Sequence, residues 1–379
     1  MRTNNDALPT ELLIQIFHHL DVADGPLGLR GALFVCRLWN TIILNDGHLW
    51  TSVVFNQTFV KQLAPDPAKL LNYIEKCSAL SGDRFIRVSV DIAAIHDYLH
   101  PDGTPTQQPY LQCFGSTRVL LLTIARAMTR AGTFRGRVRK LVFSGGHAPA
   151  PVLQAITTSV MTALVKEHLQ HLELHRCRGN AIGSIVRVPR SLETVFLFEP
   201  IGGPDSGASS GPIRARQLTF QRVSSWCGED LKHISLYQSL TTLCLISSPT
   251  SVGDLIVAAF DDLTISEHNR HSVLLPSVTT LYITGCIPFR ILDPLNLPAL
   301  TTIEVRNHDF CHPLSTVHAT TLHHTITRLA VLLTPEAVDG WSSALAIVLA
   351  EASQLQTLIA PRWMERHLSV PESVDIKLV

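Results

Sequence analysis

Charged side chains are scarce in this 379-residue sequence, at 16% of residues against roughly 25% in a typical globular domain. Hydrophobic residues make up 46%, and this combination favours a large, well-buried architecture over disorder. The formal net charge is zero, with 31 basic and 31 acidic residues, and neither sign forms a long run. Because a nucleic-acid-binding surface needs a basic stripe, we expect no nucleic-acid partner.

Features of secreted and membrane proteins are also missing. The N-terminus, "MRTNNDALPTELL", lacks the charged start and apolar core of a signal peptide. The longest apolar runs, such as "ALAIVLA", are too short to span a bilayer. The eight cysteines form no CxxC pair and no disulfide-framework spacing. We therefore expect a cytoplasmic or nuclear protein with reduced thiols and no membrane partner.

Catalytic and metal-binding motifs are weak. No Walker phosphate loop, Rossmann glycine fingerprint or HExxH motif occurs. The string "GASSG" (207–211) matches a serine nucleophile elbow, but it lies in a Gly/Ser/Pro-rich loop (199–216) instead of between a strand and a helix. His308, Cys311 and His312 are ligand types that zinc accepts, but no fourth ligand is obvious. We expect no enzymatic activity, no cofactor and no bound metal.

The first fifty residues predict three short helices. Pro9 suits a helical first turn, and apolar residues then recur at helical spacing as far as Leu20. The segment "DVADGP" (21–26) ends this helix, and a second is expected over 27–34, although two glycines weaken it. A third is expected from about Val35 to the "NDG" break at 45–47. Three short helices bury little surface alone, so part of their apolar surface should meet a partner or the rest of the chain.

The order and spacing of these residues resemble an F-box, from Leu8 to about Phe55. The motif "LPTELLIQIFHHLD…LFVCRLWNTII…HLW" carries the resemblance, and only its longer, glycine-rich loop departs from the plainest versions. The resemblance implies binding to the Skp-family adaptor of a cullin–RING ubiquitin ligase. The residues that it would assign to the adaptor-binding surface or its support are Leu8, Pro9, Leu12, Ile16, Val35, Cys36, Trp39, Leu49 and Trp50. We expect Trp39 and Trp50 to hold together a small domain whose remaining apolar face meets a partner. The alternative is that these residues form only the core of an N-terminal helical subdomain.

Downstream, a connecting helix is expected over 67–80, a strand over 84–93 and a further helix over 117–132. A strand pattern of the form L-x-x-L-x-L then recurs, mostly at 22–31-residue intervals, close to the period of leucine-rich repeats. The nine copies are "VRKLVF" (138–143), "LQHLEL" (169–174), "LETVFL" (192–197), "ARQLTF" (215–220), "LTTLCL" (240–245), "VTTLYI" (278–283), "LTTIEV" (300–305), "ITRLAV" (326–331) and "LQTLIA" (355–360).

The fold class that follows is α/β, a three-helix F-box followed by an irregular leucine-rich-repeat solenoid with a curved parallel sheet. Cys177 and Cys286 occupy the ninth repeat position, where leucine-rich repeats place an inward Asn or Cys. The expected domains are 1–55 (F-box), 56–135 (linking helices and first strand) and 136–379 (degenerate repeats). A non-repetitive α/β domain with leucine-rich parallel strands is the alternative.

Residues that alternate with the buried leucines would line the concave face and meet a target protein. They are Glu173, His175, Phe196, Phe198, Cys244, Tyr282, Glu304 and Arg306. The expected function is that of the substrate receptor of an SCF-type ubiquitin ligase, with the adaptor, the cullin–RING module and an unknown target protein as partners. A non-catalytic repeat scaffold acting without ubiquitination is the alternative. The phrases "LPSVTTLYI" and "LPALTTIEV" further resemble fungal F-box protein families.

Overall fold

We describe the fold from a computed structural model of the chain. The described residues are 8–63, 66–99, 136–145, 168–176, 191–198, 213–221, 234–246, 273–285, 295–307, 325–333, 352–368 and 372–379, with four isolated positions. The chain divides into two compact units, Met1–Leu192 (unit 1) and Glu193–Val379 (unit 2). Each unit is described by itself.

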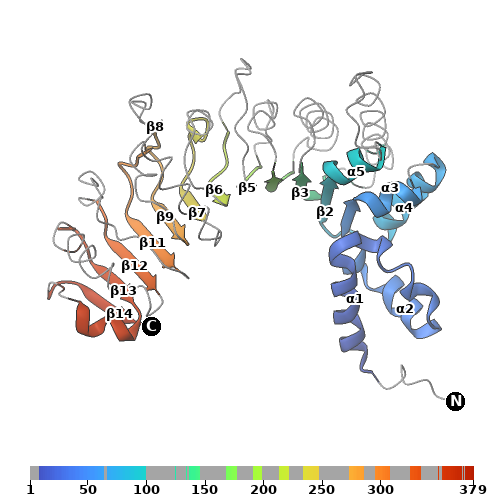
Figure 1. Cartoon of the computed structure of the whole chain (residues 1–379), viewed down its shortest axis with the longest axis horizontal. Helices are drawn as coiled ribbons and strands as arrows, with labels where there is room; N and C mark the ends of the chain where they lie inside the picture. Colours follow the sequence, from blue (N-terminus) through green and yellow to red (C-terminus); the bar gives the residue numbers. More distant parts are fainter. Residues whose placement is uncertain are drawn as a thin grey trace. The chain divides into compact units, whose positions relative to one another are not determined.

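Unit 1 begins with a helical segment (Figure 1). Its elements are α1 (Thr10–Asp24), the 3₁₀ turns η2 (Gly25–Leu27) and η3 (Ala32–Phe34), α2 (Arg37–Asn45) and the 3₁₀ turn η4 (Gly47–Trp50). The carbonyl of Pro9 accepts hydrogen bonds from the backbone N–H groups of Leu12 (3.1 Å) and Leu13 (3.2 Å). The helix start expected at Pro9 is thus confirmed, with α1 beginning at the next residue.

The middle helix expected over 27–34 is replaced by the two 3₁₀ turns. Gly25 has φ +61°, a left-handed conformation that glycine adopts without steric cost. A side chain at Gly25 would lie 2.7 Å from the carbonyl oxygen of Ser52. The glycine thus ends α1 and allows the chain to pass close to the strand that follows.

The helical segment continues directly into a sheet. Strand β1 (Ser52–Phe55) is followed by α3 (Gln57–Leu63), α4 (Pro67–Leu80), β2 (Ile86–Asp91) and α5 (Ile92–Leu99). The helix predicted over 67–80 is confirmed, with Asp66 capping it by accepting from the N–H groups of Ala68 and Lys69. The strand predicted over 84–93 is confirmed in its central residues.

All nine repeated motifs form strands, and the strand pairings within the described residues are parallel. They belong to a 12-stranded sheet of order β1-β2-β3-β4-β5-β6-β7-β9-β11-β12-β13-β14. The fold class predicted from the sequence is confirmed as a helical N-terminal region followed by this sheet. The remaining strands are β3 (Val138–Ser144), β4 (His171–His175), β5 (Thr194–Phe198), β6 (Gln217–Gln221), β7 (Thr242–Ile246), β9 (Thr280–Thr284), β11 (Thr302–Asn307), β12 (Arg328–Leu333), β13 (Thr357–Ala360) and β14 (Asp375–Leu378).

Smaller elements complete the described part. Strands β8 (Val273–Leu274) and β10 (Leu295–Asn296) form a separate two-stranded parallel sheet, and the 3₁₀ turn η7 (Arg362–His367) precedes β14. The helix predicted over 117–132 lies almost entirely outside the described residues, as do Cys177 and Cys286.

The repeated motif sets both the core and the strand register. In "LTTLCL", the apolar residues at motif positions one, four and six, Leu240, Leu243 and Leu245, are at most 1% exposed. Except for β3, each of the nine motif strands begins at the third motif position. The residues that alternate with the buried ones therefore lie on the opposite face of the sheet. Unit 2 shows its strands side by side in chain order (Figure 1).

A threonine ladder runs along the entry to these strands. The carbonyl oxygen of Thr241 accepts from the N–H groups of Thr279 (3.0 Å) and Thr280 (3.1 Å), and also from the Thr279 hydroxyl (3.3 Å). In the same way, the Thr279 carbonyl accepts from the N–H and hydroxyl of Thr301, and the Thr301 carbonyl accepts from those of Thr327. The threonines at the second motif position of β9, β11 and β12 thus satisfy the carbonyl group at the same position of the preceding strand.

Candidate functional site

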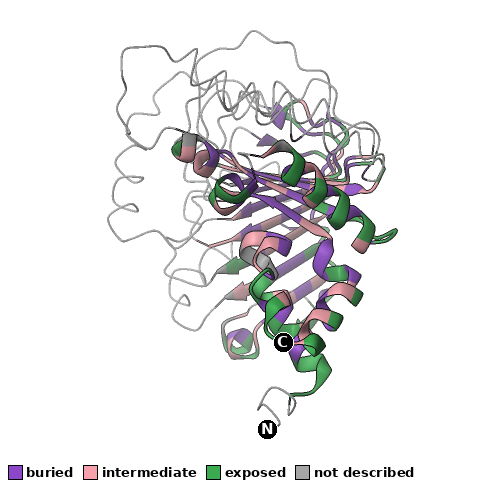
Figure 2. Cartoon of the chain, turned by 90° about the vertical axis from the view of Figure 1, so that its right-hand side faces the viewer, coloured by how far each residue is buried: buried purple, intermediate pink, exposed green. Residues whose placement is uncertain are grey.

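The apolar residues of α1 divide into two groups. Leu13 and Phe17 are fully buried in the core of unit 1. Leu12, Ile16 and Leu20 are instead 41–46% exposed, and their four-residue spacing places them along one side of the helix. Leu8, two residues before the helix begins, is 40% exposed. Figure 2 shows exposed residues along α1. The apolar residues expected at helical spacing therefore lie partly in the core and partly on the surface.

A second group of exposed apolar residues comes from η3 and the start of α2. Phe34 is 81% exposed, Val35 49% and Leu38 40%. We call the seven exposed residues of the two groups the helical apolar surface: Leu8, Leu12, Ile16, Leu20, Phe34, Val35 and Leu38. Groups of exposed apolar side chains in a folded chain are typical of protein-interaction sites.

Two of the predicted residues join the elements that carry this surface. Phe17 of α1 and Trp39 of α2 make an edge-to-face contact with ring centroids 5.1 Å apart. Cys36 caps α2, since its Sγ accepts from the backbone N–H of Trp39 at 3.5 Å. Nearby, the Asn40 side chain donates to the carbonyl of Leu33 at 3.0 Å and holds the turn before α2.

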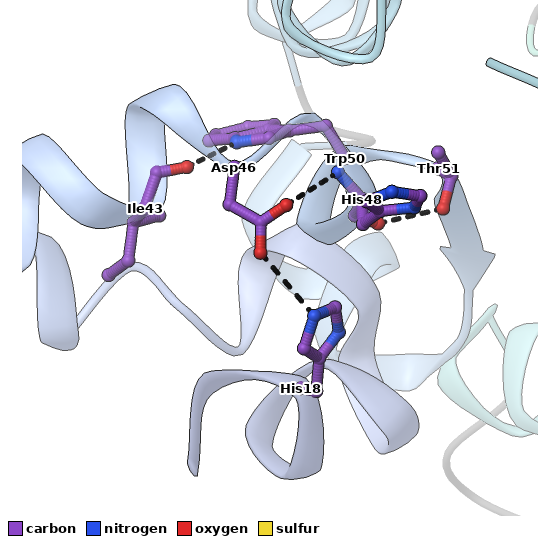
Figure 3. Close-up of polar contacts among 6 residues, drawn as sticks. All are labelled: His18, Ile43, Asp46, His48, Trp50 and Thr51. Atoms are coloured by element: carbon purple, nitrogen blue, oxygen red, sulfur yellow. Dashed lines mark hydrogen bonds and ion pairs between the residues drawn. The ribbon is translucent and has the colours of Figure 1, made fainter. Parts of the chain in front are cut away.

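The segment after α2 is fixed by polar contacts (Figure 3). Asp46 accepts from the N–H of His48 at 3.0 Å, and its other carboxylate oxygen lies 3.4 Å from Nε2 of His18 on α1. The indole Nε1 of Trp50 donates to the carbonyl of Ile43 at 2.8 Å. These contacts join the middle of α1 to the end of α2 and to η4.

Leu49 and Trp50 lie in the core instead of on the surface. Leu49 is fully buried and Trp50 is 3% exposed. Besides its bond to α2, the Trp50 ring has Nζ of Lys76, on α4, 5.6 Å from its centroid. Among the residues predicted to bind the adaptor, these two can therefore support the helical apolar surface but cannot line it in this conformation.

No linker separates the helical segment from the sheet of unit 1. Strand β1 starts one residue after η4 and pairs with β2 from Ser52↔Arg87 to Phe55↔Val90. Beyond it, Nδ2 of Asn56 donates to a carboxylate oxygen of Asp24 at the end of α1, at 2.5 Å. The helical segment that carries the helical apolar surface is thus joined directly to the first strands of the sheet.

The residues that alternate with the buried ones along the strands form one face of the sheet, which we call the strand face. In unit 1 this face carries a compact charged cluster. Glu173 on β4 lies 2.5 Å from Nζ of Lys140 on β3 and 3.5 Å from Nε2 of His175. The hydrogen bond from His175, together with the hydrogen bond and positive charge of Lys140, lowers the pKa of Glu173 to about 2 despite its partial burial. The register pairs Lys140 with His171 and Val142 with Glu173, so these side chains form adjacent rows.

On the strand face of unit 2, the register aligns most of the residues predicted to meet a target. One row runs Phe196, Thr219, Cys244, Tyr282, Glu304 across successive strands. Arg306 pairs with Thr284 in a neighbouring row and donates from Nε to a Glu304 oxygen at 2.6 Å. Cys244 is only 9% exposed, and Phe198 pairs with Gln221 but its side chain lies outside those described.

The other candidate sites lie outside the described residues. These are the "GASSG" string with Ser209 and the group His308, Cys311 and His312. Among the residues that the structure covers, no group of three or more His, Cys, Asp or Glu could hold a metal ion. No helix in that part is long and apolar enough to cross a membrane.

Sequence reasoning missed Leu20, Phe34 and Leu38 as surface residues. Leu20 follows Ile16 by one helical step of four residues, so the spacing already contained this signal. Phe34 and Leu38 could not be assigned without knowing that the segment before α2 forms a 3₁₀ turn.

With this geometry established, the chain was compared with known proteins. Residues 5–56 match the family model described as F-box-like. No curated protein matches the chain. The matched residues include α1 through β1, and hence the whole helical apolar surface. The chain carries an F-box-like domain at its N-terminus, and such a domain implies binding to a Skp-family adaptor.

Proposed function

We propose that this chain is the substrate-recognition subunit of an SCF-type cullin–RING ubiquitin ligase. The F-box-like domain would bind the Skp-family adaptor, and through it the cullin–RING module. A degenerate leucine-rich-repeat domain, formed by the parallel strands, would bind the target protein. The proposed domains are 1–55, 56–135 and 136–379, and the proposed location is cytoplasmic or nuclear.

The observation that carries this proposal is the helical apolar surface within the F-box-like domain. At least 40% of each side chain is exposed at Leu8, Leu12, Ile16 and Val35. Full burial of a leucine-sized side chain would stabilise the folded or bound state by about 1.5–3 kcal/mol. The Pro9 carbonyl accepts hydrogen bonds in the first turn of α1, which carries Leu12, and Cys36 and Trp39 hold α2 in place. An adaptor groove would cover the exposed side chains and bury the apolar area that the chain leaves open.

The chain itself would hold the target near the ligase and would contribute no catalytic group. Because β1 follows the helical segment without a linker, an adaptor-bound ligase would be held at a fixed orientation to the unit 1 sheet. Holding a target near the ligase raises its effective concentration, which can accelerate transfer without any catalytic group in this chain. The residues proposed to hold the target are Glu173, His175, Phe196, Phe198, Tyr282, Glu304 and Arg306.

The test is co-elution of the full chain with a purified Skp-family adaptor. A Leu12→Asp/Ile16→Asp variant should lose adaptor binding, because two carboxylates would be buried without partners. Leu274→Asp is the matched control, since Leu274 is 57% exposed on β8, far along the chain from the F-box-like domain. Adaptor binding by the double variant, or its absence in the unchanged chain, would refute the proposal.

Receptor and scaffold roles differ in a second measurement. In a reconstituted ligase, partners that bind the unchanged chain should acquire ubiquitin, and the Leu12→Asp/Ile16→Asp chain should bind them without transfer. A scaffold that acts without ubiquitination would bind the adaptor and partners, yet no bound partner would be modified.

A further inference from the structure

The strand face of unit 2 changes character between β9 and β11. On β5, β6, β7 and β9, the described face positions include no Asp, Glu, Lys, Arg or His. We call this part the neutral section. Its first row reads Thr194, Gln217, Thr242, Thr280 and its second Phe196, Thr219, Cys244, Tyr282.

The neighbouring strands β11 to β14 present a different surface, which we call the charged section. Glu304 and Arg306 form an ion pair at 2.6 Å, and Asp375 and Lys377 lie 3.7 Å apart. Arg328 continues the row of Thr302 and is exposed. The charged side chains on the described strand face of unit 2 therefore lie in the charged section, and the neutral section has none.

Two aromatic residues mark the ends of the second row of the neutral section. Phe196 and Tyr282 are half-buried, and two small residues between them, Thr219 and Cys244, are each 9% exposed. Three strand intervals separate the aromatic residues, which is about 14 Å at the spacing of strands in a sheet. An extended peptide crosses that distance in about four residues.

The polar groups between the two aromatic residues already have partners. Nε2 of Gln217 donates to Sγ of Cys244 at 3.7 Å, and Thr219 also hydrogen-bonds this thiol. Burial raises the pKa of the Cys244 thiol, so it stays protonated and uncharged at neutral pH. A ligand covering this row therefore finds no charge to neutralise.

We propose that the neutral section binds an uncharged target segment with apolar or aromatic side chains about four residues apart. Aromatic side chains and depletion of charge characterise the buried centre of protein interfaces. A carboxylate or phosphate laid over this section would lose its hydration and gain no opposite charge. The inference rests on the proposed receptor function and specifies the chemistry of its target.

The experiment measures binding of synthetic 12-residue peptides to the full chain in complex with the adaptor. One set is uncharged, with two aromatic or aliphatic residues four apart; a second carries phosphoserine or Asp between them, and a third carries Lys. The uncharged set should bind, and each added charge should weaken binding at least tenfold. Preference for the phosphorylated or acidic set, or no binding by any set, would overturn the inference.

Matched variants locate the binding. Thr242→Glu in the neutral section should weaken peptide binding at least tenfold, whereas Thr357→Glu should change it less than twofold. Both threonines are half-buried and occupy the same row of the face, on β7 and β13. Tyr282→Ala tests the same surface without adding charge and should also weaken binding tenfold. Equal effects of Thr242→Glu and Thr357→Glu, or none from Tyr282→Ala, would refute the inference.

Failure here is distinguishable from failure of the proposed function. All three variants should keep adaptor binding, because their substitutions lie outside the F-box-like domain. If acidic peptides bind instead, the receptor role survives and only the target chemistry is wrong. If the adaptor does not bind the unchanged chain, the receptor role fails whatever the peptides do.

Discussion

The indole N–H of Trp50 donates a hydrogen bond to the backbone carbonyl of Ile43, at 2.8 Å. The bond reaches back over seven residues, from η4 to the last turn of α2, where a helix leaves its carbonyls without helical partners. One buried side chain thus caps the helix, fills the core and directs the chain into β1.

Trp50→Ala should destabilise unit 1 by about 3–5 kcal/mol, the cost of removing a buried aromatic side chain. Trp50→Phe keeps most of the ring but leaves the Ile43 carbonyl unpaired, and should cost about 1–3 kcal/mol. Urea unfolding followed by tryptophan fluorescence and circular dichroism measures both. Equal stability of the Phe variant and the unchanged chain would show that the hydrogen bond contributes nothing.

Two glycines of the loop after α1 should respond in opposite directions to alanine. Gly25 has φ +61° and a Cβ there would meet the Ser52 oxygen at 2.7 Å, so Gly25→Ala should destabilise by more than about 1 kcal/mol. Gly31 has φ −62°, and a Cβ added there would meet no atom within 4 Å, so Gly31→Ala should be neutral or stabilising by up to about 1 kcal/mol. Thermal unfolding of both variants checks this, and a destabilising Gly31→Ala would contradict it.

Much of the helical segment was predictable because its signals are local. Pro9, the four-residue apolar spacing and the "NDG" break depend on neighbouring residues alone. Which apolar residues of α1 are buried was not predictable, since Leu12 and Leu13 have the same chemistry and only the packing of α1 against η2, α2, η4 and β1 decides between them. The buried place of Leu49 and Trp50 depends likewise on contacts with α2 and α4.

The strands were predictable because the motif L-x-x-L-x-L carries its own period. Side chains alternate between the two faces of a strand, so the fixed apolar positions of the motif determine which face is buried. Equivalent motif positions then pair between neighbouring strands, which sets the register. The threonine ladder was not foreseen, although the repeated "TT" contained its signal. Pairs such as Lys140 with Glu173 were not predictable either, because they join residues 33 apart that only the parallel pairing brings together.

Glu173 should make the stability of unit 1 depend on pH in the acid range. Its pKa falls from 4.5 to about 2 on folding, so the carboxylate contributes stability that is fully present above pH 4.5 and is lost as pH falls toward 2. Glu173→Gln should therefore destabilise by about 1–3 kcal/mol at pH 7, and the difference from the unchanged chain should shrink between pH 4.5 and 2.

Urea midpoints across this pH range measure the effect. Asp375→Asn is a suitable control, since Asp375 and Lys377 are both largely exposed and such pairs contribute little. A Glu173→Gln difference that stays constant from pH 7 to 2 would show that the cluster with Lys140 and His175 does not act through the charge of Glu173.

Phe34 provides the sharpest separation of binding from folding. It is 81% exposed in the free chain, so Phe34→Ala should leave the free energy of unfolding within about 0.5 kcal/mol. If the adaptor covers the helical apolar surface, the same change removes an aromatic anchor and should weaken adaptor binding by about 2 kcal/mol, or about thirtyfold. Phe85→Ala is the matched control, because Phe85 is 58% exposed beside the Arg139 guanidinium and outside the F-box-like segment. Calorimetric titration of the adaptor into each variant measures this, and an unchanged affinity for Phe34→Ala would show that Phe34 is not part of the adaptor contact.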